Sequence, residues 1–426
     1  MTIKSNIRFY VYEHTLVIMN NLLISRKFIV LRDMQKHIVA WTDFHKYIRS
    51  GKNKVAHNIS DDGNKRSSYI TMFLNYIFFD KFSIDKLNDI TIDMVISFLN
   101  DYGKGTRPGD NKSRSETTVN VCIRTIIDFI ECIYDVNKKA YSFIPSDLYK
   151  IVEVRNKRGN LIKQKIPKFI VHYIPNEHQI FRDIPESVFS ILLDHIMTKH
   201  KDILMLVALS AFAGLRPSES CNVRRNDSVL GAGIRFEIID GEITDIIIDL
   251  KMEVNLRSDL VKVGGIKKER VQRVYPAFIK AFYECYLTYI EYIEGKKYEV
   301  DYGALTVNKQ GKAITYSNYY GKFKKVIDEI IPILLRSDQA EVINYGHLLQ
   351  EHNISPHIFR HWFSVQLTLI GEDVSGLMFW RGDRSPESAL TYLQEKSDLE
   401  RQYHKVNNEM FDYHLWQANK IYGVAK

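Results

Sequence analysis

The stretch Ala213-Gly-Leu-Arg-Pro-Ser-Glu219 places one arginine between a glycine and a proline, at the end of an apolar run. Residues 203–213 predict a buried helix, and Pro217 suits the first turn of the next helix. Arg216 is therefore predicted to lie at a turn between two elements, from which its side chain can enter a cleft. The alternative is an arginine that only pairs with Glu219, three residues further on. We expect Glu219 to orient Arg216 rather than to take part in a reaction.

A second polar segment is Pro356-His-Ile-Phe-Arg-His361. Ser355 is a candidate N-cap and Pro356 fits a first helical turn, so a helix is predicted to begin here. His357 and Arg360 then share one face, near a helix N-terminus whose partial positive charge favours an anion. We expect Arg360 to clamp a phosphate, and His357 to donate to a phosphate oxygen or to handle a proton.

Metal binding is the alternative for this second segment, because His357 and His361 are four residues apart on the predicted helix. The helix of a zinc protease would carry a glutamate directly after the first histidine, and Ile358 stands there instead. We therefore expect no metal at this place, and we expect His361 and Phe363 to be packing residues.

The third segment is Gly382-Asp-Arg-Ser-Pro-Glu-Ser-Ala-Leu-Thr-Tyr392. Ser385 and Pro386 have the form of a helix start, which would place Tyr392 about two turns into a short helix. The chain has 25 tyrosines among 426 residues, so a tyrosine at one spacing is weak evidence by itself. It gains weight as the last member of an ordered set.

Taken in order, these three segments closely resemble the tyrosine recombinase (phage integrase) family, over roughly residues 60–400. The family carries G-L-R-x-S-E, then H-x-x-R-H, then a tyrosine nucleophile. The resemblance implies a site-specific recombinase or integrase that cuts and rejoins DNA through a 3′-phosphotyrosyl intermediate. Arg216, His357 and Arg360 would bind and activate the phosphate, and Tyr392 would attack it.

The chemistry of phosphodiester cleavage supports this interpretation. Without a metal, the reaction needs cations aimed at the non-bridging oxygens, and the planar guanidinium group stays charged and binds phosphate through two nitrogens. A tyrosine that attacks phosphorus keeps the bond energy in a phosphotyrosyl ester, which allows rejoining without ATP. We expect the reaction to need no metal and no nucleotide cofactor.

The resemblance also implies a lysine, in a β-hairpin turn, that serves as general acid for the leaving 5′ oxygen. The turn Gly264-Gly-Ile-Lys-Lys-Glu-Arg270 lies between two strand patterns, and Lys268 fits that position best. Lys267 is its neighbour and a predicted DNA contact, and Lys262 is a weaker candidate. For all three lysines, simple contact with the DNA backbone is the alternative.

One position departs from the family. Asp383 stands nine residues before Tyr392, where the family has histidine or tryptophan. A carboxylate only accepts hydrogen bonds and would repel a phosphate that it faced. Asp383 could instead turn away and cap a local turn, or orient Arg381 or Arg384. Trp380, nearby, is predicted to pack in the core.

The fold class predicted from these patterns is mainly α, with a small antiparallel β-sheet in the catalytic domain. Helical periodicity begins near residue 60, and strand patterns occur between about 234 and 275, marked by Gly241 and Gly264-Gly265. We predict an accessory N-terminal segment at 1–58 and a helical core-binding (DNA-binding) domain at 59–145. A basic linker at 146–180 and a catalytic domain with a C-terminal tail at 181–426 follow.

The predicted linker is strongly basic. A solvated linker and one that follows a phosphate backbone are both consistent with this charge. The predicted DNA contacts in it are Lys157, Arg158, Lys163 and Lys165.

The overall composition agrees with an anionic partner: the formal net charge is +8 and the pI is about 9.0. The four cysteines form no C-x-x-C pair, so a disulfide scaffold or zinc ribbon is not expected. No apolar run predicts a membrane span and no signal peptide is recognised, so we expect a cytoplasmic protein. Abundant Ile, Lys, Asn and Tyr suggest an AT-rich bacterial genome or mobile element.

The expected partner is double-stranded DNA, bound by a homo-tetramer at the nucleoid. The tail from residue 399 packs either on its own domain or on a neighbouring copy. Two other functions stay open: a catalytically impaired DNA-binding protein on the same scaffold, which Asp383 favours, and a type IB topoisomerase-like enzyme. The separate helical domain and the tail favour recombination over topoisomerase activity.

Overall fold

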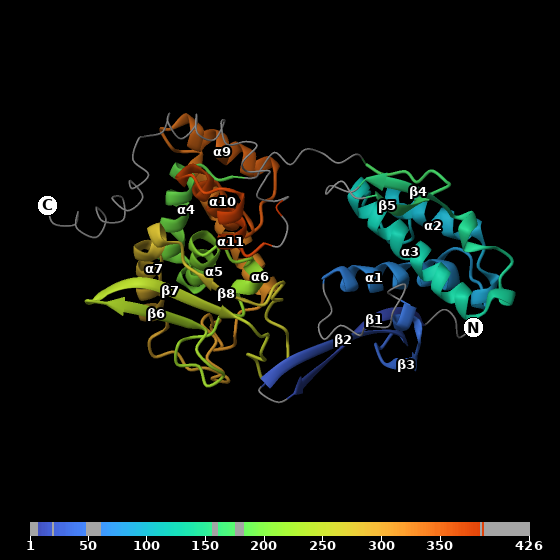
Figure 1. Cartoon of the computed structure of the whole chain (residues 1–426), viewed down its shortest axis with the longest axis horizontal. Helices are drawn as coiled ribbons and strands as arrows, with labels where there is room; N and C mark the ends of the chain where they lie inside the picture. Colours follow the sequence, from blue (N-terminus) through green and yellow to red (C-terminus); the bar gives the residue numbers. More distant parts are fainter. Residues whose placement is uncertain are drawn as a thin grey trace. The chain divides into compact units, whose positions relative to one another are not determined.

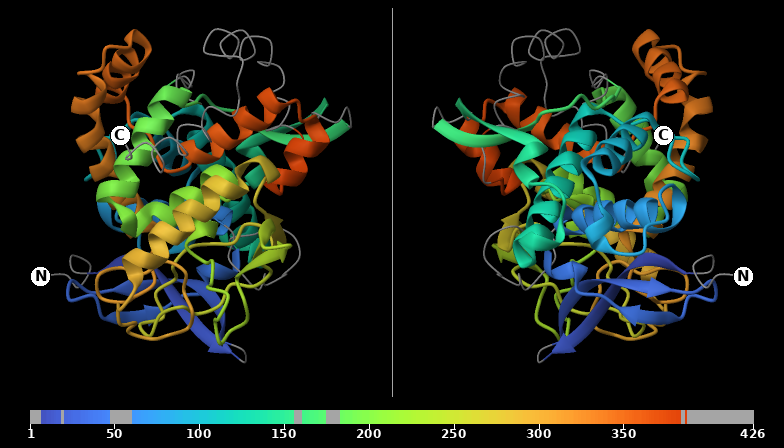
Figure 2. Two further views of the ribbon diagram at one scale, coloured as in Figure 1. Left: turned by 90° about the vertical axis from the view of Figure 1, so that its left-hand side faces the viewer. Right: turned by 90° about the vertical axis from the view of Figure 1, so that its right-hand side faces the viewer.

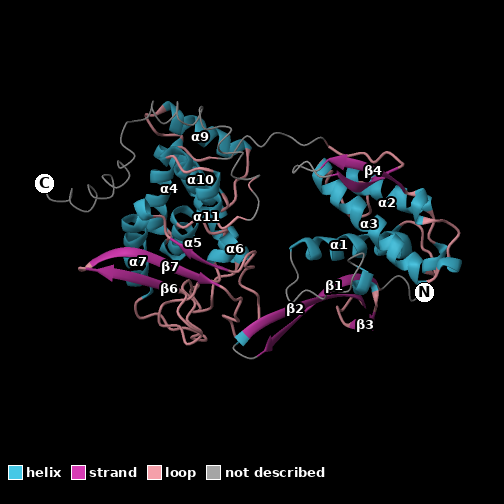
Figure 3. Ribbon diagram, viewed as in Figure 1, coloured by secondary structure: helices cyan, strands magenta, loops and turns pink. Residues whose placement is uncertain are grey.

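The computed structural model describes residues 7–18, 21–47, 61–155, 161–174, 183–383 and 386. The chain folds into two compact units (Figure 1). The first comprises Met1–Leu16 and Ile24–His178, and the second Val17–Leu23 and Gln179–Lys426, each as far as it is described. The described chain is rich in helices and has small antiparallel sheets (Figure 3), which confirms the predicted fold class.

The N-terminal residues form a three-stranded sheet with the order β1-β2-β3, in dark blue in Figure 2. The strands are β1 (Arg8–Ile18), β2 (Leu22–Arg32) and β3 (Ile38–Trp41). This sheet was not predicted from the sequence, because its apolar and basic residues have no clear period of two. Phe9 and Asn75 join it to the helices: Asn75 Oδ1 accepts from the Phe9 amide at 2.8 Å, and its Nδ2 donates to the Phe9 carbonyl at 2.9 Å.

Three α-helices form the core of the first unit: α1 (Asp61–Asn75), α2 (Ile92–Lys104) and α3 (Glu116–Val136), with a π-helical turn at Tyr76–Asp80. Thr91 caps helix α2, because its side chain accepts from the Met94 amide. Helix α2 ends at Gly105, which has φ +75°. The apolar faces of the three helices pack on one another around Phe73, Phe98 and Phe129.

The basic stretch predicted as a linker contains a two-stranded antiparallel hairpin, β4 (Tyr149–Arg155) with β5 (Leu161–Pro167). Lys165 of β5 forms ion pairs with Asp128 and Glu131 of α3, and Tyr149 of β4 also donates to Glu131. The hairpin therefore packs on the helices of the first unit. The stretch can form a hairpin in spite of its high positive charge, because the acidic side chains of α3 offset that charge.

The second unit is a larger helical body with one sheet. Helices α4, α5, α10 and α11 lie together, and the sheet runs along one side of the helices (Figure 1). Every residue of α5 from Ile203 to Phe212 is buried, as the uninterrupted apolar run predicts. The helices are α4 (Glu186–Lys199), α5 (Lys201–Phe212), α6 (Pro217–Ser220), α7 (Ile279–Ile293), α8 (Tyr316–Leu334), α9 (Ala340–Glu351), α10 (Ile358–Ile370) and α11 (Val374–Arg381).

The sheet of the second unit has the order β6-β7-β8, with β6 (Ile234–Ile239), β7 (Glu242–Leu250) and β8 (Arg270–Arg273). Its strands lie where the alternating patterns predict them, and Gly241 takes φ +84° in the β6–β7 turn. In β8, Arg270 and Gln272 point to one face because successive side chains alternate. None of the described helices is both long enough and apolar enough to cross a membrane.

Candidate active site

Arg216 lies at the N-cap of the short helix α6, as the sequence predicts. Gly214 takes φ +64° just before it, so the chain turns sharply out of the buried helix α5. The Arg216 amide donates to Glu219 Oε2 at 3.1 Å, and its Nη1 donates to Glu219 Oε1 at 3.1 Å. This double contact orients the guanidinium group and leaves Nη2 directed elsewhere.

Glu219 is the buried anchor of the site, with a side chain that is 0% exposed. Besides Arg216, it accepts two hydrogen bonds from Arg270 of β8, with Nη1 at 3.1 Å from Oε1 and Nη2 at 2.9 Å from Oε2. Burial by itself would raise the pKa of Glu219. The hydrogen bonds and charge of Arg270, together with the charge of Arg216, more than offset this and lower that pKa to about 2. Glu219 is therefore ionised at neutral pH.

Arg360 comes from helix α10. Its Nη1 donates to the Gly214 carbonyl, so the same glycine turn that directs Arg216 also holds Arg360. The side chain is 1% exposed. Burial, and then the charges of Arg216 and Arg381, lower its pKa to about 9, so it still carries its charge at pH 7.

Asp383 faces the arginines. Its Oδ1 accepts from Arg216 Nη2 at 2.7 Å and from Arg360 Nη2 at 2.8 Å, and its Oδ2 lies 2.9 Å from Arg381 Nε. The suggestion that Asp383 turns away is therefore wrong, whereas its pairing with Arg381 is confirmed. Gly382 explains the direction: it takes φ +62° as the C-cap of α11 and bends the chain back toward the arginines.

His357 lies at the end of helix α10 near the arginines, but the helix begins later than predicted. Ile358 is its first residue and its N-cap is His357, not the predicted Ser355, with no side-chain capping hydrogen bond. Burial, then the charges of His361, Arg360 and Arg216, lower the pKa of His357 to about 3. The imidazole is therefore neutral at pH 7, with one N–H to donate.

Lys268 lies on the wall of a cavity of about 460 Å³ beside the arginines. The cavity is also lined by Arg270, Gln272, Met378, Phe379, Gly382 and Asp383, among others. Of the other two lysines, Lys262 forms an ion pair with Glu253 at 2.8 Å, and Lys267 is exposed. The role of Lys268 stays a prediction, and Lys262 is less available for such a role because Glu253 offsets its charge.

The remaining predicted site residues are placed in part. Lys163 and Lys165 lie on β5 in the first unit, where Lys163 is exposed and Lys165 pairs with α3. Tyr392, Lys157 and Arg158 lie outside the described residues. Trp380 packs edge-on against Tyr275, at a centroid distance of 5.0 Å, as expected.

Arg270 was not predicted from the sequence to belong to this site, and Arg381 was named only as a candidate partner of Asp383. Arg381 is 6% exposed and donates from Nη1 to Ser364 Oγ at 2.8 Å. Arg270 could have been found, because alternation in the predicted strand places it on one face with Gln272. Arg381 gave no such signal, because an arginine in the last turn of a helix is ordinarily a surface residue.

The arrangement can hold an oxyanion, as the contacts with the Asp383 carboxylate show. Arg216 and Arg360 each use one nitrogen for an internal anchor and direct Nη2 at a single carboxylate oxygen. Donors held in advance around one oxygen stabilise negative charge without reorganisation. A phosphate oxygen and a carboxylate oxygen are equivalent as acceptors here.

The chain matches no known protein-family model, and no curated protein shows significant sequence similarity to it. Its fold is similar to several solved structures. The Tn1549 transposon integrase in complex with transposon right end DNA is 16% identical, with 88% of this chain and 97% of that chain covered and a TM-score of 0.49. The XerH site-specific recombinase bound to its difH substrate is 16% identical, with 79% and 78% covered and a TM-score of 0.44. The XerA recombinase is 14% identical, with 84% and 93% covered and a TM-score of 0.34.

Replacing Glu219 with glutamine tests the buried anchor. The variant leaves Arg216 and Arg270 without their shared carboxylate, so we expect the free energy of unfolding to fall by about 3–5 kcal/mol at pH 7. Because folding depresses the pKa of Glu219 from 4.5 to about 2, its contribution is complete above pH 4.5 and is lost as the pH falls toward 2. Urea denaturation from pH 7 to pH 3 should therefore show the two proteins converging at low pH. A constant difference would contradict this assignment.

Replacing Gly214 with alanine tests the turn that holds both arginines. A Cβ there would lie 2.5 Å from the Phe363 ring, and the residue would keep a positive φ. Overpacking and backbone strain together predict a loss of about 2–5 kcal/mol in thermal or chemical denaturation. Gly371→Ala is the control, because Gly371 has φ +104° and open space where a Cβ would lie, so only the strain of about 1–2 kcal/mol should remain. Equal losses would show that the close packing on Phe363 is unimportant.

Proposed function

We propose that this chain is a tyrosine-type site-specific DNA recombinase or integrase that serves a mobile element. The observation that carries the proposal is the convergence of Arg216 and Arg360, from separate segments, on one anionic oxygen. The ordered sequence motifs and the net charge of +8 also support it. Double-stranded DNA is the proposed partner, bound by four copies of the chain in the bacterial cytoplasm.

In the proposed reaction, Arg216 and Arg360 bind the non-bridging oxygens of the scissile phosphate. The Tyr392 oxygen attacks phosphorus, its proton passes to solvent, and the bond to the 5′ oxygen breaks. Lys268 donates a proton to that leaving oxygen. A 3′-phosphotyrosyl ester and a free 5′ hydroxyl result, and the 5′ hydroxyl of a partner duplex reverses the step.

The neutral state of His357 refines its role. An imidazole with a pKa of about 3 is a weak base at pH 7, so a donated hydrogen bond to a phosphate oxygen suits it better than proton abstraction. Arg270 would act indirectly, because it donates to Glu219, and Glu219 accepts from Arg216 and so orients it. Arg270 and Glu219 are therefore positioning residues in this proposal.

The proposed division of labour follows the chain. Residues 59–145 would form the core-binding domain, residues 181–426 the catalytic domain, and residues 1–58 an accessory segment. Lys163 and Lys267 are exposed and suit contacts to DNA phosphates, with Lys157 and Arg158 as further candidates. Lys165 is less suited, because Asp128 and Glu131 already offset its charge.

A second candidate function is a DNA-binding protein that does not cleave. The specific observation in its favour is that Asp383 covers the oxyanion donors of both arginines. Trapping of a covalent protein–DNA adduct separates the two candidates.

Duplexes that the full-length chain selects from a random-sequence library are re-synthesised with a nick at successive positions. A nick a few nucleotides beyond the cleavage site lets the short fragment that carries the new 5′ hydroxyl diffuse away, so an active enzyme accumulates as an adduct that resists SDS. We expect an adduct with the wild-type chain and none with Tyr392→Phe. Tyr320→Phe, an exposed position of α8, is the control and should keep the adduct. Binding without any adduct would favour the second candidate, and relaxation of supercoils without joining of two sites would indicate a topoisomerase.

A further inference from the structure

The donors that the proposed function assigns to phosphate are already occupied within the protein. Arg216 Nη1 is held by Glu219 and Arg360 Nη1 by the Gly214 carbonyl, and the two remaining Nη2 groups meet at Asp383 Oδ1. An anionic oxygen bound by two guanidinium groups at 2.7 and 2.8 Å has the surroundings expected of a non-bridging phosphate oxygen.

Because the arginine donors are buried, the Asp383 carboxylate that occupies them also blocks access to them. The Arg360 side chain is 1% exposed and that of Asp383 is 9% exposed. A phosphate of DNA therefore cannot contact Arg360 Nη2 while the carboxylate stays in place. Either Asp383 moves, or the arginine pair never meets a substrate.

The surroundings allow the carboxylate to move. The Asp383 amide donates to the Met378 carbonyl at 2.9 Å, so the backbone is held as part of the helix cap, while the side chain can rotate. Asp383 also lines the cavity that holds Lys268, which offers space for the displaced carboxylate next to a cation. Arg381 Nε, at 2.9 Å from Oδ2, gives it a second partner near the site.

We propose that Asp383 is an internal substitute for the scissile phosphate: it keeps the arginine pair assembled without DNA and must be displaced when DNA binds. This inference rests on the proposed function, because it concerns the regulation of the same site. Arg216, Arg360 and Arg381 repel one another, and Asp383 and Glu219 are the carboxylates that offset them. A phosphate that binds here must therefore displace the Asp383 carboxylate. This displacement costs free energy, which a chain with histidine or tryptophan at this position would not need.

The variant Asp383→Asn tests, without any DNA, whether the Asp383 carboxylate takes the place of a phosphate. The variant removes the competing charge, so the dissociation constant of inorganic phosphate is expected to fall by at least about tenfold. It also leaves three guanidinium groups short of an anion, so the variant should unfold at a lower temperature in chloride and recover in phosphate at equal ionic strength. Thermal denaturation and calorimetric titration of the full-length chain with sodium phosphate measure both effects.

Two controls separate this site from phosphate binding elsewhere. Asp259→Asn frees Arg257 from its bidentate carboxylate outside this site and should show no phosphate-dependent recovery. Combining Asp383→Asn with Arg360→Gln should abolish the recovery. Equal phosphate affinity in wild type and Asp383→Asn would overturn the proposal. The adduct assay is read separately: if phosphate binding tightens but neither protein forms an adduct, the internal-anion role stands and the recombinase function fails.

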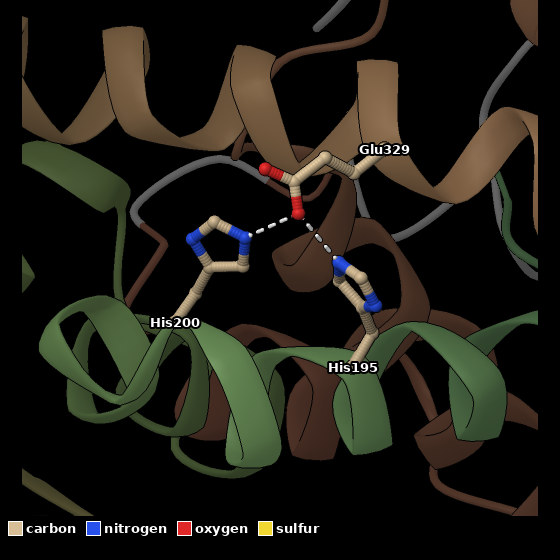
Figure 4. A group of neighbouring side chains, drawn as sticks. All are labelled: His195, His200 and Glu329. Atoms are coloured by element: carbon tan, nitrogen blue, oxygen red, sulfur yellow. Dashed lines mark hydrogen bonds and ion pairs between the residues drawn. The ribbon is translucent and has the colours of Figure 1, made fainter.

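An independent observation concerns three potential metal ligands away from the arginines. His195 of α4, His200 at the start of α5 and Glu329 of α8 point at one another (Figure 4). Glu329 Oε2 lies 3.0 Å from His195 Nε2 and 2.8 Å from His200 Nε2, and the ligand atoms all lie within 4.8 Å of one another. This is the only such group among the residues that the structure describes.

The donor set suits zinc. Two imidazole nitrogens and a carboxylate oxygen bind Zn²⁺ at about 2.0–2.2 Å, which in a tetrahedral site separates ligand atoms by about 3.3 Å. The separations of 2.8 and 3.0 Å between Glu329 Oε2 and the two imidazole nitrogens need to widen by only a few tenths of an ångström, and the two nitrogens lie within 4.8 Å of each other. His195 is buried, whereas Glu329 is about half exposed, so an ion can enter from the solvent side and keep a water as its fourth ligand.

We infer that His195, His200 and Glu329 bind Zn²⁺ and join the α4–α5 junction to α8. Calorimetric titration of the metal-free full-length chain with ZnCl₂ should give one site, with a rise in the unfolding temperature. Glu329→Gln keeps the side-chain size and an acceptor oxygen but should weaken binding by at least about tenfold. His347→Gln, on the exposed face of α9, is the control and should bind as the wild type does. If wild type and Glu329→Gln bind Zn²⁺ equally, the three residues are a hydrogen-bonded cluster and the proposal fails.

Discussion

The second unit depends on the burial of several guanidinium groups in one small volume. Arg216, Arg270, Arg360 and Arg381 converge there, and cations this close repel one another strongly where water is excluded. Two carboxylates make the arrangement stable: Glu219 accepts from Arg216 and Arg270, and Asp383 from Arg216 and Arg360. Each arginine is thereby fixed in direction, which a free surface arginine is not.

Glu219 and Asp383 differ in which nitrogens of the arginines they bind. Glu219 binds the arginines from the buried side and has a strongly lowered pKa, so it is a permanent part of the framework. Asp383 binds the Nη2 groups, which are the donors that we propose for the phosphate. One carboxylate therefore builds the anion site and the other occupies it, and this difference in position gives them opposite expected effects on phosphate binding.

Much of the second unit could be predicted from the sequence, because its local patterns are strong. The apolar run 203–212, the strand alternation and the Gly-Leu-Arg-Pro segment placed α5, β6–β8 and the turn at Arg216 close to where the structure has them. The N-terminal sheet and the β4–β5 hairpin were missed because their residues show no clear period of two, although each strand pairs with its neighbour in the sequence. The charge of the hairpin also misled, since the acidic residues of α3 that pair with Lys165 lie about 30 positions earlier in the chain.

The sequence alone determined which residue types could carry the chemistry: two arginines, a histidine, a lysine and a tyrosine in a set order. Only the tertiary structure decided that Arg270 and Arg381 join them, that His357 is neutral, and that Asp383 faces the arginines. The reason is physical. Spacing along a chain fixes which side chains share a helix face or a strand face, whereas the direction of a buried charge depends on every other charge that the fold brings within a few ångströms of it.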